Sequence, residues 1–159
     1  MSGNMIHTDL SRCIACHACQ EACGREHGGA KNVYLAASAD RTVPLACRQC
    51  EPTPCLAVCL PGALRRAGDA VLVDDEKCTG CGLCLWACPF GVMGLSGNGR
   101  PAHTCDLCLA RLERGSKPAC VLTCPSKALA YGPYEDLAAP GRQRAAAIQV
   151  RAAAHSEGK

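Results

Sequence analysis

The sequence predicts a small α+β fold built as two similar halves, in which short strands and helical turns surround groups of cysteines and regular structure is sparse. Three observations lead to this prediction. Cysteine fills sixteen of the 159 positions, the cysteines fall into four similar groups, and the chain has one Trp, one Phe and three Tyr. A core of this size normally uses more aromatic side chains, so the cysteines and whatever they bind must replace part of it.

The four cysteine groups share a spacing pattern, and each ends in C-x3-C. The first and third groups read C-x2-C-x2-C-x3-C, the second C-x2-C-x4-C-x3-C and the fourth C-x2-C-x11-C-x3-C. In chain order the groups are Cys13, Cys16, Cys19, Cys23; Cys47, Cys50, Cys55, Cys59; Cys78, Cys81, Cys84, Cys88; and Cys105, Cys108, Cys120, Cys124. An internal repeat of this kind indicates one structural unit that is used several times.

Strands are expected between and around these groups. Residues 63–66 and 70–73 have the pattern of a hairpin closed by a Gly-Asp turn. The segment "MIHTDLSRC" (5–13) supplies a strand that enters the first group, and "ALAYG" (128–132) supplies one that leaves the last. Helical turns are expected after the first cysteines of a group, as in "HACQEAC" and "LCLWAC".

The C-terminal segment differs in composition from the rest. Residues 139–159 are rich in Ala, Arg and Gln, which favour helix, and predict a helix of about three turns that begins near Gly141. Ile148 and Val150 do not share one face of such a helix. The segment is therefore either a frayed surface helix or disordered tail, or an arm that docks on a partner subunit.

Disulfides, zinc and iron–sulfur clusters compete as explanations for the cysteines. The N-terminus "MSGNMIHTDL" lacks the apolar core of a signal peptide, so we expect a cytoplasmic protein. No stretch approaches the roughly 18 apolar residues of a membrane span. An even number of cysteines would suit a disulfide scaffold, but structural disulfides are rare in a reducing cytosol. The compartment argument therefore disfavours disulfides.

Iron–sulfur clusters suit the spacing better than zinc. Zinc sites usually join two separated cysteine pairs, whereas three groups here pack three cysteines into one short loop. The run C-x2-C-x2-C-x3-C-P is typical of two-cluster ferredoxins, in which the fourth cysteine binds the neighbouring cluster. Sixteen cysteines make four [4Fe–4S] clusters with none left over, and a zinc-bound structural module is the minor alternative. Trp86 lies inside a cysteine loop and is expected to cover a cluster as a lid.

Three segments then carry a specific resemblance: "CRQCEPTPCLAVCLPGAL" (47–64), "CTGCGLCLWACPFG" (78–91) and "CDLCLARLERGSKPACVLTCPSKAL" (105–129). They resemble the four-cluster, ferredoxin-like iron–sulfur subunits of DMSO-reductase-type molybdenum and tungsten oxidoreductases. Related subunits serve formate dehydrogenase, hydrogenase, carbon monoxide dehydrogenase and aldehyde oxidoreductase complexes. The resemblance covers about residues 5–132. It departs from the family pattern at Gly24, where proline is expected, and at Leu60, which separates Cys59 from Pro61.

The resemblance implies that the groups pair crosswise, the first with the fourth and the second with the third. The implied ligand sets are Cys13, Cys16, Cys19 and Cys124; Cys23, Cys105, Cys108 and Cys120; Cys47, Cys50, Cys55 and Cys88; and Cys59, Cys78, Cys81 and Cys84. The implied fold is a duplicated two-cluster ferredoxin-like fold. Residues 1–46 and 94–138 form its first half, residues 47–93 form a second half inserted into the first, and 139–159 form the tail.

Electron transfer is the expected function, and no catalytic role is expected for the chain itself. The turn "GLSGNG" (94–99) is not followed by a Walker lysine, no Ser–His–Asp set stands out, and an all-cysteine cluster offers substrate no open iron. The resemblance implies a catalytic partner subunit with a tungsten- or molybdenum-pterin, or with nickel. A flavin subunit or a ferredoxin would be the acceptor. The alternative is a free polyferredoxin shuttle, and copies that stack into a longer wire are a variant.

Nucleic acid is not expected as a partner. The formal net charge of +3 counts every thiol as neutral. Four clusters that contribute about −2 each would bring the loaded chain to about −5. The sequence also lacks a nucleic-acid-reading motif, and it has too few aromatic residues to form a surface on which bases stack.

Overall fold

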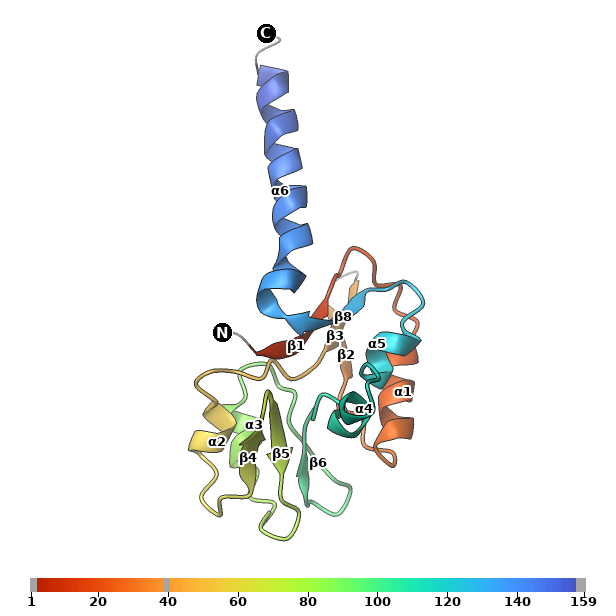
Figure 1. Cartoon of the computed structure of the whole chain (residues 1–159). Helices are drawn as coiled ribbons and strands as arrows, with labels where there is room; N and C mark the ends of the chain where they lie inside the picture. The colour runs from red at the N-terminus through yellow and green to blue at the C-terminus, as the bar shows by residue number, and fades with distance from the viewer. Residues whose placement is uncertain (1–2, 39–40, 157–159) are drawn as a thin grey trace.

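The computed structural model describes residues 3–38 and 41–156. Within these residues the chain forms four two-stranded antiparallel sheets and six helices. The short elements make up one body, from which the C-terminal helix projects (Figure 1). The expected α+β class is confirmed.

The two ends of the body lie side by side, although they are far apart in the sequence (Figure 1). Strand β1 (Asn4–Thr8) pairs antiparallel with β8 (Leu129–Pro133), from Asn4 opposite Pro133 to Thr8 opposite Leu129. Helix α1 (Ala18–Glu26) packs against α5 (Ala119–Thr123). Both strands were expected from the sequence. Their pairing brings the first cysteine group next to the last.

The middle of the chain repeats this combination of two strands and two helices. Strands β4 (Leu64–Ala67) and β5 (Ala70–Val73) form the expected hairpin, with Gly68 in the left-handed region that the turn requires. Helix α2 (Pro54–Ala57) packs against α3 (Leu83–Ala87). The second cysteine group therefore lies next to the third.

Several short elements were not expected from the sequence. They are β2 (Tyr34–Ser38), β3 (Arg41–Leu45), β6 (Gly94–Leu95) and β7 (Ala102–His103). Helix α4 (Leu109–Glu113) directly follows the first two cysteines of the fourth group, where a helical turn was expected. In the β2–β3 hairpin, strand β2 contains two alanines and no β-branched residue, and β3 is interrupted by Pro44, so neither strand has a strong β pattern. Leu35 and Leu45 pack on the core, so tertiary contacts hold this hairpin in place.

Helix α6 (Tyr134–Ser156) starts earlier than the sequence suggested. Its expected start near Gly141 is wrong, because the helix begins at Tyr134 and runs through Pro140. The first turn packs on β8 and β1, and Arg144 forms an ion pair of 3.1 Å with Asp9 near β1. These contacts compensate for the backbone hydrogen bond that Pro140 removes. Residues 141–151 are exposed on every side. In the part of the chain that is described, no helix is long and apolar enough to cross a membrane.

The cysteines themselves form much of the core. Ten of the sixteen are buried, and they lie among a few fully buried apolar residues such as Val33, Val92 and Leu107. This agrees with the expectation that cysteine replaces part of a normal apolar core.

Gly80 is predicted to be essential to the loop between Cys78 and Cys81. It has φ +72°, and a Cβ atom there would meet the carbonyl oxygen of Gly99. We expect Gly80→Ala to lower the free energy of unfolding by at least about 2 kcal/mol, because left-handed strain adds to a backbone clash. Urea unfolding of the metal-loaded protein measures this. Gly97→Ala is the matched control, since a Cβ there meets nothing within 4 Å; equal midpoints for the two variants would contradict the prediction.

Candidate metal centres

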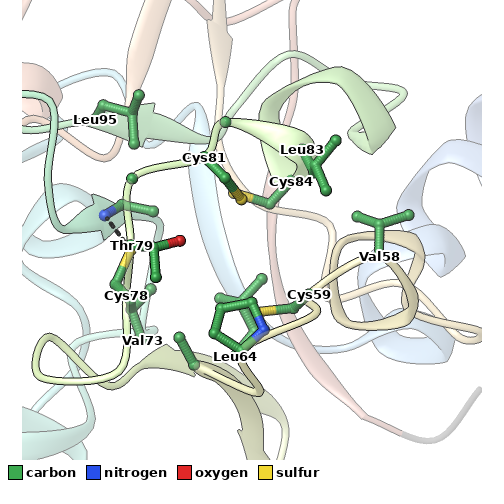
Figure 2. Close-up of a pocket in the computed structure, with 15 residues that line it drawn as sticks. Val58, Cys59, Leu64, Val73, Cys78, Thr79, Cys81, Leu83, Cys84 and Leu95 are labelled. Atoms are coloured by element: carbon green, nitrogen blue, oxygen red, sulfur yellow. Dashed lines mark hydrogen bonds between the residues drawn. The ribbon is translucent and has the colours of Figure 1, made fainter.

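Three cavities of similar size are each lined by four cysteines that come from two different groups. Their volumes are about 330, 320 and 350 Å³, and each is partly open to solvent. In the same order the cysteines are Cys13, Cys16, Cys19, Cys124; Cys47, Cys50, Cys55, Cys88; and Cys59, Cys78, Cys81, Cys84. We call these the Cys13, Cys47 and Cys59 sets. Figure 2 shows the thiols of the Cys59 set around a common space.

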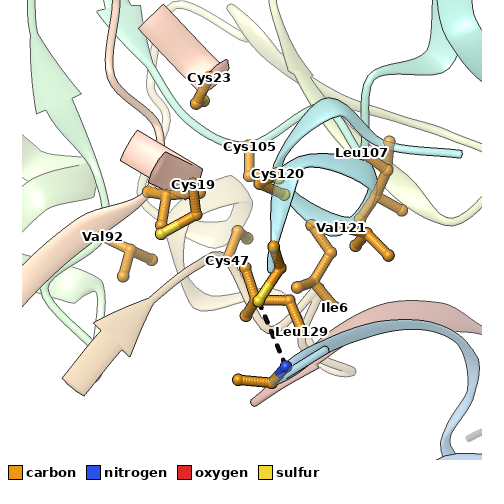
Figure 3. Packing of buried hydrophobic residues seen from close by; sticks show 14 residues of the cluster. Ile6, Cys19, Cys23, Cys47, Val92, Cys105, Leu107, Cys120, Val121 and Leu129 are labelled. Atoms are coloured by element: carbon orange, nitrogen blue, oxygen red, sulfur yellow. Dashed lines mark hydrogen bonds between the residues drawn. The ribbon is translucent and has the colours of Figure 1, made fainter. Parts of the chain in front are cut away.

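The remaining four cysteines lie deeper. Cys23, Cys105 and Cys120 are in the buried core (Figure 3), and Cys108 is also buried. Burial, followed by the nearby thiolates of Cys108 and Cys23, raises the pKa of the Cys120 thiol to about 12. Burial raises the pKa of the Cys105 thiol, and the nearby Cys120 adds to the rise. These four residues, which we call the Cys23 set, are therefore close neighbours.

The four sets follow one another through the molecule. Cys19 of the Cys13 set is close enough to raise the pKa of Cys120 in the Cys23 set. Burial raises the pKa of Cys105 in the Cys23 set, and Cys47 is close enough to add to the rise. Cys55 of the Cys47 set shares a core cluster with Cys78 and Cys84 of the Cys59 set. The order along the line is thus Cys13, Cys23, Cys47 and Cys59.

The buried thiols favour a bound cation. Burial raises the pKa of Cys55 to about 11 and that of Cys105 well above its ordinary value. A thiol in such surroundings keeps its proton unless positive charge lies beside it. A site made of thiols alone, closely spaced and buried, therefore fits a metal group that takes thiolate ligands.

Backbone N–H groups support the thiolate form at several sulfurs. Asn32 donates to Cys23 Sγ at 3.3 Å, Ala102 to Cys78 Sγ at 3.3 Å and Ala128 to Cys124 Sγ at 3.2 Å. Burial of Cys124 raises its pKa, but the hydrogen bonds of neighbouring backbone N–H groups outweigh burial and leave the pKa lowered. Hydrogen bonds to sulfur are also a means by which proteins set cluster potentials.

One backbone feature recurs in all four groups. The residue directly before the second cysteine has a positive φ in each: Ala15 (55°), Gln49 (50°), Gly80 (72°) and Leu107 (59°). A left-handed conformation is costly for residues other than glycine, and it persists where the surrounding structure demands it. The sequence signals this conformation at Gly80 alone, so the shared loop geometry is visible only in the structure.

Thr104 gives an independent indication that a sulfur-rich group fits at the Cys47 set. It is 6% exposed, and within the described residues its buried hydroxyl has no hydrogen-bond partner. A buried hydroxyl without a partner costs about 1–3 kcal/mol. The hydroxyl lies beside Cys47, so a thiolate or sulfide at that site would provide the acceptor it lacks.

His27 and Asp106 form an ion pair that sequence reasoning missed. His27 Nε2 lies 2.9 Å from Asp106 Oδ1, and His27 Nδ1 lies 2.9 Å from the carbonyl oxygen of Cys23. Because both ring nitrogens face acceptors, the ring carries two protons, and the carboxylate of Asp106 holds the pKa of His27 far above its usual range. His27 and Asp106 are 79 residues apart. Nothing in the local sequence of either residue predicts that they meet.

The expected role of Trp86 as a lid is wrong. Its side chain is 91% exposed and does not line the cavity of the Cys59 set, although Leu83 one turn earlier does. The short helix α3 directs Cys84 inward and leaves Trp86 on the outer side.

Residues 39–134 match the family described as "4Fe-4S dicluster domain". The chain belongs to this family. The description of the family names [4Fe–4S] clusters, which favours iron–sulfur over zinc at the cysteines within the matched residues.

Three relatives of this dicluster protein are named as parts of oxidoreductases. A sulfite dehydrogenase subunit of Allochromatium vinosum is 33% identical, with 90% of this chain and 72% of the relative covered. The thiosulfate reductase electron transfer subunit PhsB of Salmonella typhi is 35% identical, with 83% and 76% covered. The iron-sulfur subunit of nitrate-inducible formate dehydrogenase of Escherichia coli is 31% identical, with 93% and 60% covered. The resemblance to iron–sulfur electron-transfer subunits is confirmed.

The His27–Asp106 pair predicts a pH-dependent stability. A histidine whose pKa is raised on folding stabilises fully below its unfolded value of about 6.5, and this contribution declines as pH rises towards the folded value. We therefore expect His27→Gln to cost more stability at pH 6 than at pH 9, as measured by urea unfolding at both values. In an Asp106→Asn background the pH trend should shrink. A loss that is the same at both pH values would contradict the prediction.

Proposed function

We propose that this chain carries four [4Fe–4S] clusters and relays electrons between a catalytic oxidoreductase subunit and an acceptor or donor. In this proposal the partner holds a molybdenum- or tungsten-pterin and performs the catalysis. One observation carries the proposal: three cavities are each lined by four cysteines, three from one group and the last from another. The relatives named as subunits of dehydrogenases and a reductase support the choice of partner.

The proposed ligands are the Cys13, Cys23, Cys47 and Cys59 sets, with one cluster to each. The shared cavities support three of these assignments. The Cys23 set is supported by the proximity of Cys108 and Cys23 to Cys120, whose pKa they help to raise. We propose also that the fold is a duplicated ferredoxin-like fold, with residues 47–93 inserted between 1–46 and 94–138. The strand pairs β1–β8 and β4–β5, each accompanied by a helix pair, support the duplication.

Each bound cluster would supply the capacity to take up and release one electron. The chain contributes the thiolate ligands, the backbone N–H groups that stabilise them and the apolar residues that exclude water. Val33, Val71 and Val92 are each 1% exposed and lie among the buried cysteines. The order of the four sets supports a single path from one end of the line to the other.

Both ends of this line reach the surface. Cys16 and Cys81 are the two exposed cysteines, and they belong to the outermost sets. Ile14 is 63% exposed near the first, and Leu60 is 87% exposed beside Cys59 of the last. Exposed apolar side chains at both ends favour docked partners over a free shuttle. Helix α6, which projects from the body (Figure 1), offers a further surface for docking.

Elemental analysis of the complex, purified without oxygen from its native host, tests the function. We expect iron near sixteen atoms per chain, because four cubanes hold about four irons each. Molybdenum or tungsten should co-purify with a larger subunit. Nickel would redirect the proposal to hydrogenase or carbon monoxide chemistry, and four zinc ions per chain with little iron would overturn it.

Crossed ligation predicts which cluster each mutation damages. Cys88→Ser should weaken the cluster held by Cys47, Cys50 and Cys55, because Cys88 lines that cavity. Its counterpart Cys59→Ser should weaken the cluster held by Cys78, Cys81 and Cys84. Electron paramagnetic resonance and Mössbauer spectra of the two variants should show losses of different signals. Loss of the same signal in both variants would refute the crossed assignment.

A further inference from the structure

Residues 102–105 touch more than one cysteine set. The backbone N–H of Ala102 donates to Cys78 Sγ at 3.3 Å, which joins the segment to the Cys59 set. Three residues later Cys105 belongs to the Cys23 set. Between them, Thr104 lies beside Cys47 of the Cys47 set. The segment therefore gives a short connection, made of one hydrogen bond and four consecutive residues, between sets that belong to the two proposed halves.

His103 adds a second connection to the Cys23 set. Its Nδ1–H donates to Asn32 Oδ1 at 2.7 Å, and the backbone N–H of Asn32 donates to Cys23 Sγ at 3.3 Å. Asn32 is 4% exposed. Thr104 therefore lies between His103, which Asn32 anchors, and the buried Cys105, and it has little freedom to move.

Gln49 fixes the other side of this junction. Its side-chain Nε2–H donates to the carbonyl oxygen of Cys105 at 2.8 Å, and its Oε1 accepts from the backbone N–H of Val71 at 3.0 Å. Gln49 is 5% exposed and lies two residues after Cys47. It therefore holds the loop of Cys47 against Cys105, with Thr104 next to the contact.

The hydroxyl of Thr104 is the unexplained group at this junction. Burial raises the pKa of the Cys47 thiol, while the backbone N–H of Gln49 and the Thr104 hydroxyl oppose the rise. Yet the hydroxyl completes no hydrogen bond of good geometry with any atom of the described residues. A valine would fill the same space without a buried polar group, so the packing alone does not account for a threonine.

We propose that Thr104 is a positioning residue that tunes electron transfer between the two halves. Its hydroxyl donates a hydrogen bond to a sulfur at the Cys47 set, either the Cys47 thiolate or a sulfide of the bound cluster. The inference rests on the proposed ligand sets. A hydrogen bond to sulfur stabilises the more negative, reduced form, so Thr104 raises the potential at the Cys47 set above that of a site without it. No bond is made or broken at Thr104, and its proton stays on the oxygen.

Redox titration of the full chain, followed by electron paramagnetic resonance, tests the proposal. Thr104→Val keeps the shape and removes the hydroxyl, whereas Thr104→Ser keeps the hydroxyl. At the wild-type midpoint we expect Thr104→Val to raise the oxidised-to-reduced ratio of one cluster about tenfold, which corresponds to about 59 mV for one electron. We expect Thr104→Ser to restore the wild-type value.

Thr123→Val is the matched control. Thr123 also directly precedes a cysteine, Cys124, but its side chain is exposed. This variant should leave all potentials unchanged. Unchanged potentials in Thr104→Val, or the same shift in Thr123→Val, would overturn the proposal.

The remaining outcomes are also decisive. If Thr104→Val loses iron, Thr104→Ala is titrated instead, and the same rise in the oxidised-to-reduced ratio is expected. Loss of iron from both variants would overturn a tuning role. A wild-type chain without about sixteen irons would instead refute the proposed function, so the two failures are distinguishable.

Discussion

The structure depends on the burial of thiols that ionise only next to positive charge. Burial raises the pKa of Cys105 well above its usual value and contributes most to the rise of Cys120 to about 12, and both lie in the core. The apolar residues around them are few and mostly small. A core of this kind gains little from hydrophobic burial alone, so metal binding and folding are coupled.

Crossed cysteine sets explain why distant segments pack together. The Cys13 set includes Cys124, and the strands next to these cysteines are β1 and β8, which pair with each other. The Cys59 set joins the end of α2 to the loop before α3 in the same way. Metal binding at each set would therefore close a long loop of the chain. The residues before the second cysteines, such as Ala15 and Leu107, have a left-handed conformation that costs free energy locally. Closure of these loops by a bound metal group can offset that cost.

The interior and the ends of the line of sets have different surroundings. The Cys23 set is enclosed by buried apolar residues and by the His27–Asp106 ion pair. The outer sets place Cys16 and Cys81 at the surface next to exposed apolar residues. An insulated middle with accessible ends suits a protein that passes electrons between partners and performs no chemistry on a substrate itself. The family and its named relatives agree with that role.

The sequence alone determined the number and grouping of the cysteines, the iron–sulfur family, the α+β class and the strands around residues 5–8, 64–73 and 129–132. These features are local, because a C-x2-C spacing and a Gly-Asp turn are encoded within a few residues. The cavities that the cysteines share are visible only in the structure, since the sequence implied these sets through the family resemblance and not through any local pattern. The structure alone decided the position of Trp86 on the surface and the start of α6 at Tyr134. It also decided that His27 meets Asp106 and that Thr104 lies beside Cys47. Such contacts join segments far apart in the chain, so they arise from packing, which no short stretch of sequence specifies.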